Sequence, residues 1–149
     1  MGYERPSTDV EKEANPHLPP RPATAPSSRH YLKRINQRSR VKAKNTVIAS
    51  WVDVGADVAA INAGKAIRTG DAFLVNGRRY QQEASGTLAP IDGVGLFPLD
   101  RVAYNALAVY NQFGETSVAE VILARMHGVT DQAKQQALYA YRAARQSRG

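Results

Sequence analysis

Cysteine is absent from this chain of 149 residues, and histidine is scarce. Without cysteine the protein has neither a disulfide framework nor a thiolate that could bind a metal or act as a nucleophile. The three histidines are His17, His30 and His127, and no two of them have the spacing of metal ligands. The sequence therefore predicts no metal site, no cofactor and no catalytic residue.

Long apolar runs are also missing. A membrane-spanning helix needs roughly 20 consecutive apolar residues, and the best stretch, TVIASWVDVGADVAAI, is interrupted by Asp53 and Asp57. The beginning of the chain is charged and rich in proline, unlike a signal peptide. We therefore expect a soluble, cytoplasmic protein that has no membrane partner.

Acidic residues are absent from Ala14 to Val52, and this gap contains most of the excess positive charge. The formal net charge of the chain is +7. Residues 29–45, RHYLKRINQRSRVKAKN, carry seven lysines or arginines and no acid, whereas the segments on either side are close to neutral. A block of like charge stays solvated unless a polyanion or a membrane surface neutralises it.

Composition divides the chain into three parts. Residues 1–28 contain six of the eight prolines and are expected to be a disordered linker, because proline fixes φ and removes a hydrogen-bond donor. Residues 29–45 form a basic arm, which we expect to be partly helical. Residues 46–149 have an ordinary globular composition and should fold as one compact α+β domain.

Within this domain, the sequence predicts a β-hairpin or three-stranded sheet packed on a C-terminal three-helix bundle. Residues 71–82, DAFLVNGRRYQQ, place Asn76 and Gly77 between two alternating runs, which is the strongest short-range signal for a hairpin. KAIRTG before it and GTLAPID after it could each add a strand, and IDGVGLFPLD is expected to be a connecting loop.

Helix signals surround this sheet. A short helix is expected to end at Gly64, which suits a left-handed C-terminal position. The three C-terminal helices are expected over residues 101–113, 118–127 and 131–146. Their N-caps are expected to be Asp100, Thr116 or Ser117, and Thr130. Before them, Trp51, the only tryptophan, lies in the apolar run with Val47, Ile48 and Val52 and is expected to anchor the core.

One segment resembles part of a nucleotide-binding loop. NAGKA, residues 62–66, looks like the end of the pattern G-x-x-x-x-G-K-[ST]. The first glycine of that pattern would fall at Ala59, and the hydroxyl that holds magnesium would fall at Ala66. Alanine can supply neither the flexibility of that glycine nor the hydroxyl group, so the segment is not a nucleotide-binding loop.

The basic arm favours a nucleic-acid partner. Tyr31, Asn36, Gln37, Ser39 and Asn45 interleave with its cations and supply groups for stacking and hydrogen bonding. We therefore predict a nucleic-acid-associated protein without enzymatic activity, in which the arm provides most of the affinity. The predicted contact residues are Arg29, Lys33, Arg34, Arg38, Arg40, Lys42, Lys44, Arg78 and Arg79.

Two other classes of function remain open. The chain could be an adaptor whose arm meets an acidic protein, or a small toxin-like effector enzyme, although a catalytic constellation is missing. A positive face that continues from the arm to Arg78 and Lys134 would favour nucleic acid, and scattered charge would favour the adaptor. Residues 118–141 could form a helix-turn-helix, since Ala124 and Gly128 have the separation of that motif, but an ordinary helical hairpin has the same signals.

Overall fold

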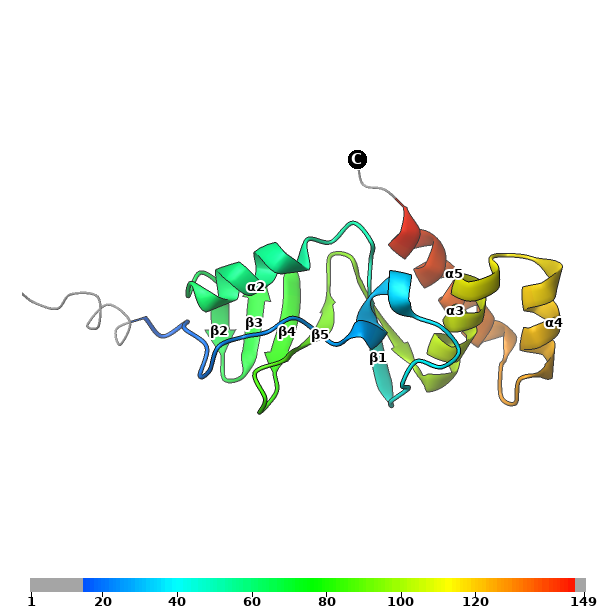
Figure 1. Ribbon diagram of the computed structural model, residues 1–149, viewed down its shortest axis with the longest axis horizontal. Helices are drawn as coiled ribbons and strands as arrows, with labels where there is room; N and C mark the ends of the chain where they lie inside the picture. Colours follow the sequence, from blue (N-terminus) through cyan, green and yellow to red (C-terminus); the bar gives the residue numbers. More distant parts are fainter. Residues whose placement is uncertain (1–14, 147–149) are drawn as a thin grey trace, which may run out of the picture.

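The computed structural model describes residues 15–146, and its centre is a six-stranded antiparallel sheet in the order β1-β6-β5-β4-β3-β2 (Figure 1). The strands are β1 (Lys44–Ile48), β2 (Ile67–Thr69), β3 (Ala72–Val75), β4 (Arg78–Gln82), β5 (Leu88–Gly93) and β6 (Leu96–Asp100). Strands β2 to β6 follow one another as a meander, and β1 pairs antiparallel with β6 at the edge.

The α+β class is confirmed, but the sheet is larger than the three strands predicted. The hairpin around Asn76 and Gly77 forms as expected, with both residues at positive φ and Val75 paired with Arg78. The expectation of a loop over residues 91–100 was wrong. Gly93 and Gly95 adopt positive φ there and turn the chain from β5 into β6.

The helices are α2 (Val54–Asn62), α3 (Arg101–Phe113), α4 (Ser117–Arg125) and α5 (Asp131–Arg145). The predicted caps Asp100, Thr116 and Thr130 each accept a hydrogen bond from the backbone N–H three residues later. Gly64, just after α2, has a positive φ as expected. Within residues 15–146, no helix is both long enough and apolar enough to cross a membrane.

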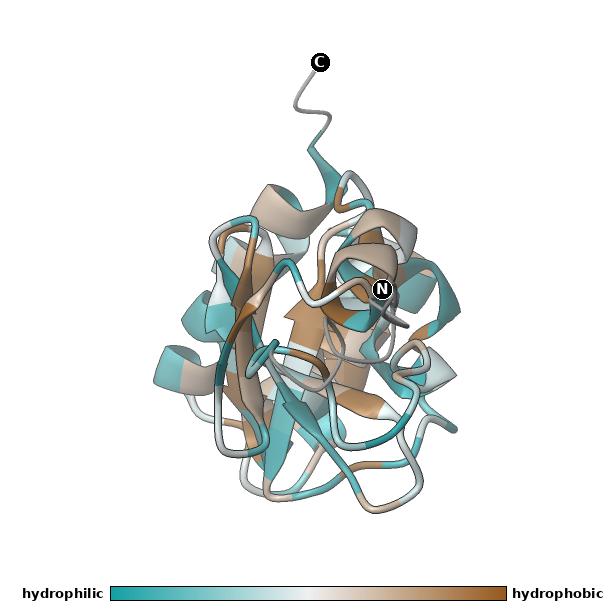
Figure 2. Ribbon diagram, turned by 90° about the vertical axis from the view of Figure 1, so that its left-hand side faces the viewer, coloured by the Kyte–Doolittle hydropathy of each residue, from teal (hydrophilic) through white to brown (hydrophobic). Residues whose placement is uncertain are grey.

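Helices pack against both faces of the sheet. Ile48 packs with Val54 of α2 and with its cross-strand partner Leu96. Its neighbour Val47 points to the opposite face, where it joins the core formed with α3 and α5. In Figure 2 the most hydrophobic segments accordingly gather in the interior of the molecule. Of the three C-terminal helices, α3 and α5 pack on the sheet and on each other, whereas α4 packs on α3 at the far end of the molecule (Figure 1).

Trp51 is less buried than expected. Val47 and Ile48 are fully enclosed, whereas Trp51 and Val52 are half-buried at the margin of the same core. The Trp51 Nε1 donates a hydrogen bond to the Ala143 carbonyl at 3.4 Å, which joins the segment after β1 to the end of α5.

Residues 15–27 form an extended strap that crosses the sheet from the β2 side towards β1 (Figure 1). Ala23 is buried, and both its N–H and its C=O are hydrogen-bonded to the Asn62 side chain, at 2.8 and 2.9 Å. Thr24 forms a parallel bridge with Thr87. The predicted disorder was therefore wrong for residues 15–28, because partners distant in sequence satisfy this backbone. Residues 1–14 of the predicted linker lie outside the described residues.

The basic arm is also folded onto the domain. It contains two 3-10 turns, η1 (Ser28–His30) and η2 (Leu32–Arg34), and no α-helix. Three residues per turn place Leu32 and Ile35 on one side, where both are buried against the core. The Asn111 side chain donates to their two carbonyls at 2.6 and 2.9 Å. The final two residues of the arm belong to β1.

A buried ion pair links α2 to the β3–β4 hairpin. Asp57 is fully buried and accepts hydrogen bonds from the Arg78 Nε at 2.6 Å, the Arg78 Nη2 at 3.1 Å, the Tyr80 hydroxyl at 2.5 Å and the Asn76 Nδ2 at 2.8 Å. Burial opposes the charge on Asp57, but the hydrogen bonds from Arg78, Tyr80 and Asn76 outweigh it and hold the pKa of this carboxyl below its usual value.

The substitution Asp57→Asn should lower the free energy of unfolding by about 3 kcal/mol, because it leaves the Arg78 guanidinium buried without a carboxylate. The matched control is Asp92→Asn, which breaks the exposed pair between Asp92 on β5 and Arg79, the neighbour of Arg78 on β4, and should change stability little. Urea unfolding followed by Trp51 fluorescence measures both variants. Equal losses in the two variants would show that burial does not set the strength of these pairs.

Candidate anion-binding cleft

A surface cleft of about 590 Å³ lies between the basic arm and the loop that joins β4 to β5. Five of the predicted contact residues line this cleft: Arg29, Arg34, Arg38, Arg40 and Lys42. Hydroxyl and amide side chains complete its polar wall, from Ser27, Ser28, Asn36, Ser39 and Thr87. Glu83 is the one acid in the wall. We call this feature the cationic cleft.

Asn45 on β1 holds both ends of the arm in place. Its side chain is fully buried. The Oδ1 accepts hydrogen bonds from the Arg29 Nη1 and from the Lys42 backbone N–H, both at 2.8 Å. The Nδ2 donates to the Lys42 carbonyl at 2.6 Å. One buried amide thus fixes the first and last cations of the cleft relative to each other.

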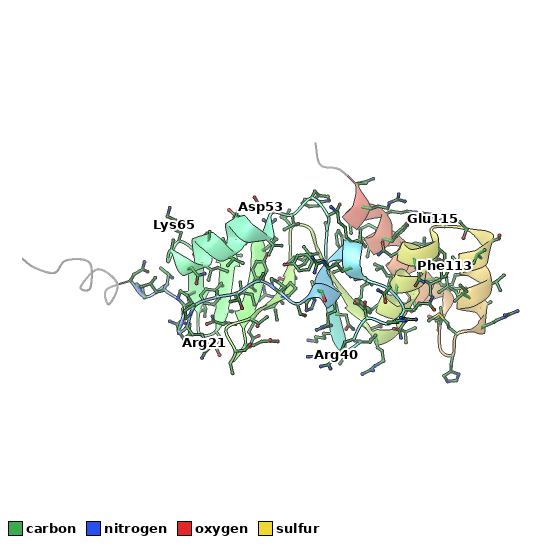
Figure 3. The ribbon with its side chains drawn as sticks, in the orientation of Figure 1. Arg21, Arg40, Asp53, Lys65, Phe113 and Glu115 are labelled. Atoms are coloured by element: carbon green, nitrogen blue, oxygen red, sulfur yellow. The ribbon has the colours of Figure 1, made fainter. Side chains whose placement is uncertain are left out.

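The turn that carries Arg38 and Arg40 is shaped by its own polar side chains. The Asn36 Oδ1 accepts from the Arg38 N–H at 2.7 Å, and the Ser39 Oγ accepts from the Asn36 N–H at 3.0 Å. These short-range bonds are typical of turns. Figure 3 shows Arg40 on the side of the molecule away from α2, whose two ends are marked by Asp53 and Lys65.

The cations of the cleft lack acidic partners. Within residues 15–146, none of the lysines and arginines of the arm forms an ion pair. Arg29 is half-buried, and this burial, with a further contribution from nearby Arg40, lowers the pKa of its guanidinium. Positive groups held close together in a concave site raise the local concentration of anions. The cleft is therefore built to attract a negatively charged ligand.

His30 lies in the wall of the cationic cleft and was not among the predicted contact residues. Its position in the arm was the only signal that could have identified it. It is only 5% exposed, and its Nδ1 lies 2.8 Å from the Thr46 carbonyl oxygen. Burial lowers the pKa of His30 to about 4, and the positive charges of Arg29 and Lys42 add to this effect. The ring is therefore neutral near pH 7. Because a carbonyl can only accept, the proton is on Nδ1 and Nε2 is a hydrogen-bond acceptor.

Three other predicted residues lie outside the cationic cleft. Lys44 and Arg79 line an adjoining cleft of about 660 Å³, which also contains Arg29 and His30. Lys33 lines a third hollow of about 470 Å³ beside η2. The cations of the arm therefore lie on neighbouring surfaces, and most of them line the cationic cleft.

The prediction that Arg78 contacts a ligand was wrong. Arg78 is buried, and Asp57 neutralises its charge. Lys134 is also neutralised, by Glu120 of α4 at 2.6 Å. A continuous positive face from the arm to these two residues is therefore not formed. By the criterion stated for the sequence, this scattered charge favours the adaptor. The case for a nucleic-acid partner therefore depends on the arm and its cleft alone.

Helices α4 and α5 fit both a helix-turn-helix and an ordinary helical hairpin. Gly128 has a positive φ in the turn between α4 and α5, and Gln132, Gln135 and Gln136 are exposed on α5. A helix-turn-helix and a helical hairpin share these features. Elsewhere, no group of three or more potential metal ligands occurs among residues 15–146.

Comparison of the chain with protein-family models, with curated protein sequences and with solved structures found no match. The geometry and charge of the clefts are therefore the guide to function.

Mild acid should destabilise the fold through His30. The pKa of His30 is about 4 in the folded chain and has an ordinary value of 6.5, so its contribution is present above pH 6.5 and is lost as the pH falls. The free energy of unfolding should drop by about 2 kcal/mol between pH 7 and pH 5. Asp57 contributes little in this interval, because its ordinary pKa of 3.8 lies below it.

The control for this prediction is His30→Asn, whose amide can still donate to the Thr46 carbonyl but does not titrate. This variant should lose clearly less stability than the original chain between pH 7 and pH 5, as measured by urea unfolding at both values. An identical loss in the variant would assign the acid sensitivity to another group.

Proposed function

We propose that the protein binds nucleic acid through its phosphates, with the cationic cleft as the contact surface, and that it acts by binding and not by catalysis. The observation that carries this proposal is the convergence of five cationic side chains on one cleft, with Glu83 as the one acid among them. Neutralising phosphates releases the counterions that surround a nucleic acid, and this release drives association.

The chemistry of the cleft favours phosphate among the possible anions. Four of its five cations are arginines, and the planar guanidinium can donate two parallel hydrogen bonds to phosphate oxygens. The serine and threonine hydroxyls in the wall are further donors of the kind that contact phosphates. Such contacts position a ligand without reading its sequence, so we expect weak sequence preference.

A second candidate function is binding of an acidic protein segment. The observation that favours it is the neutralisation of Arg78 by Asp57 and of Lys134 by Glu120, which leaves no continuous positive face from the arm to these two residues. A short run of carboxylates would be long enough to occupy the cationic cleft. Competition between a polyglutamate peptide and an oligonucleotide for the intact protein distinguishes the two ligands.

Replacing Arg34, Arg38 and Arg40 with Ser should weaken binding to all sequences alike. The slope of log K against log salt should flatten by about 2.7 for a duplex or about 2.1 for a single strand if all three contact phosphates. Fluorescence anisotropy titrations of a labelled oligonucleotide at several salt concentrations measure this slope. The matched control replaces Lys65, Arg125 and Arg145, three exposed cations outside the cleft, with Ser.

The control variant has the same net charge as the cleft variant, so a general effect of charge would lower binding equally in both. That outcome would contradict the assignment of the cleft. If the intact protein binds neither duplex nor single strand at low salt, the nucleic-acid proposal is wrong, and retention of polyglutamate would then support the acidic-protein alternative.

A further inference from the structure

The adjoining cleft differs in chemistry from the cationic cleft but shares a wall with it. Arg29, His30 and Ala89 line both clefts. Beyond this shared wall, five apolar residues line the adjoining cleft together with polar and charged ones. The apolar residues are Ala43, Pro90, Ile91, Pro98 and Leu99, and the others are Lys44, Thr46, Arg79, Gln81, Asp92 and Asp100. A ligand that extends across the shared wall therefore passes from a positively charged surface, past a neutral histidine, to a surface that offers these apolar side chains.

This order matches the order of chemical groups in one nucleotide, which runs from an anionic phosphate through a polar ribose to a flat base. We propose that the two clefts together bind single-stranded RNA, with a phosphate in the cationic cleft, the ribose at His30 and the base in the adjoining cleft. This inference rests on the proposed function and names its ligand class.

The arrangement favours a single strand over a duplex. In a duplex the bases are stacked and paired inside the helix, so an apolar surface beside the phosphates would remain empty, whereas single strands can place unstacked bases on protein surfaces. A volume of about 660 Å³ is within the usual size of small-ligand sites.

The ring of His30 favours ribose over deoxyribose. Its Nδ1 donates to the Thr46 carbonyl, and among residues 15–146 its Nε2 has no hydrogen-bond partner, although His30 is only 5% exposed. A buried acceptor without a donor is costly. The 2′-hydroxyl of RNA is a donor that lies between phosphate and base, and DNA lacks it. A bound ribose would therefore complete the hydrogen bonding of His30.

The experiment compares three short labelled ligands of one sequence with the full chain: single-stranded RNA, single-stranded DNA and an RNA duplex. Anisotropy titrations should give the highest affinity for single-stranded RNA, with a preference over DNA of roughly 5-fold to 10-fold, as expected for one hydrogen bond. His30→Asn keeps a donor for Thr46 and removes Nε2. This variant should bind RNA and DNA almost equally, with the DNA affinity unchanged.

A second variant tests the base site without touching a buried residue. Ala43 is exposed and lines the adjoining cleft, so Ala43→Phe should fill that cleft and weaken single-strand binding several-fold, while leaving any duplex binding through the cationic cleft intact. Circular dichroism and thermal unfolding check that both variants are folded.

The outcomes separate this inference from the proposed function. If none of the three ligands binds, the proposed function is wrong, and the inference is wrong with it. If the duplex binds as tightly as the single strands and Ala43→Phe changes nothing, the base site is wrong while phosphate binding stands. If single-stranded RNA and DNA bind alike, or if folded His30→Asn keeps the full preference for RNA, the role of His30 is overturned.

Discussion

The buried amide of Asn45 is the interaction on which the candidate site depends. It accepts from Arg29 at one end of the basic arm and bonds to the backbone of Lys42 near the other. The arm is therefore a closed loop fastened to the edge strand β1. Without this closure, the repulsion among its cations would drive the segment into solvent. A few hydrogen bonds thus convert a charge-rich stretch of sequence into a concave surface of defined shape.

In the described part of the chain, the fold pairs some of its cations with carboxylates and leaves those of the arm without such partners. Arg78 is enclosed with Asp57, and Arg79, Lys134 and Arg142 lie beside carboxylates at the surface. The cations of the arm have no such partners within residues 15–146. Buried and paired charges stabilise or orient the elements that carry them, whereas unpaired charges in a cleft are available to a ligand. The arm defines the candidate site because five of its cations line one cleft, whereas other exposed cations without an ion pair among the described residues, such as Lys65 and Arg125, lie outside it.

The sequence predicted features that depend on neighbouring residues. Asn76 and Gly77 specify their turn by local backbone preference, and Asp100 and Thr130 cap helices that begin at the next residue. Features that depend on distant partners were missed. Arg78 was expected to be exposed because its partner Asp57 lies on another element, 21 residues earlier. The charge of the arm was evident from the sequence, but the cleft was not, because Asn45 gives no sign of its pairing with Arg29, 16 residues away.

The strap has a consequence for the order in which the chain assembles. Its partners Asn62, Arg68, Gln82 and Thr87 all follow it by about 40 to 60 residues. During synthesis on the ribosome the strap emerges before all of these partners, and the full set is present only when the chain has been made up to the start of β5. Its prolines prevent it from forming a competing helix during that interval. The first described segment of the chain is therefore among the last to reach its native position, and it closes over a sheet that has already formed.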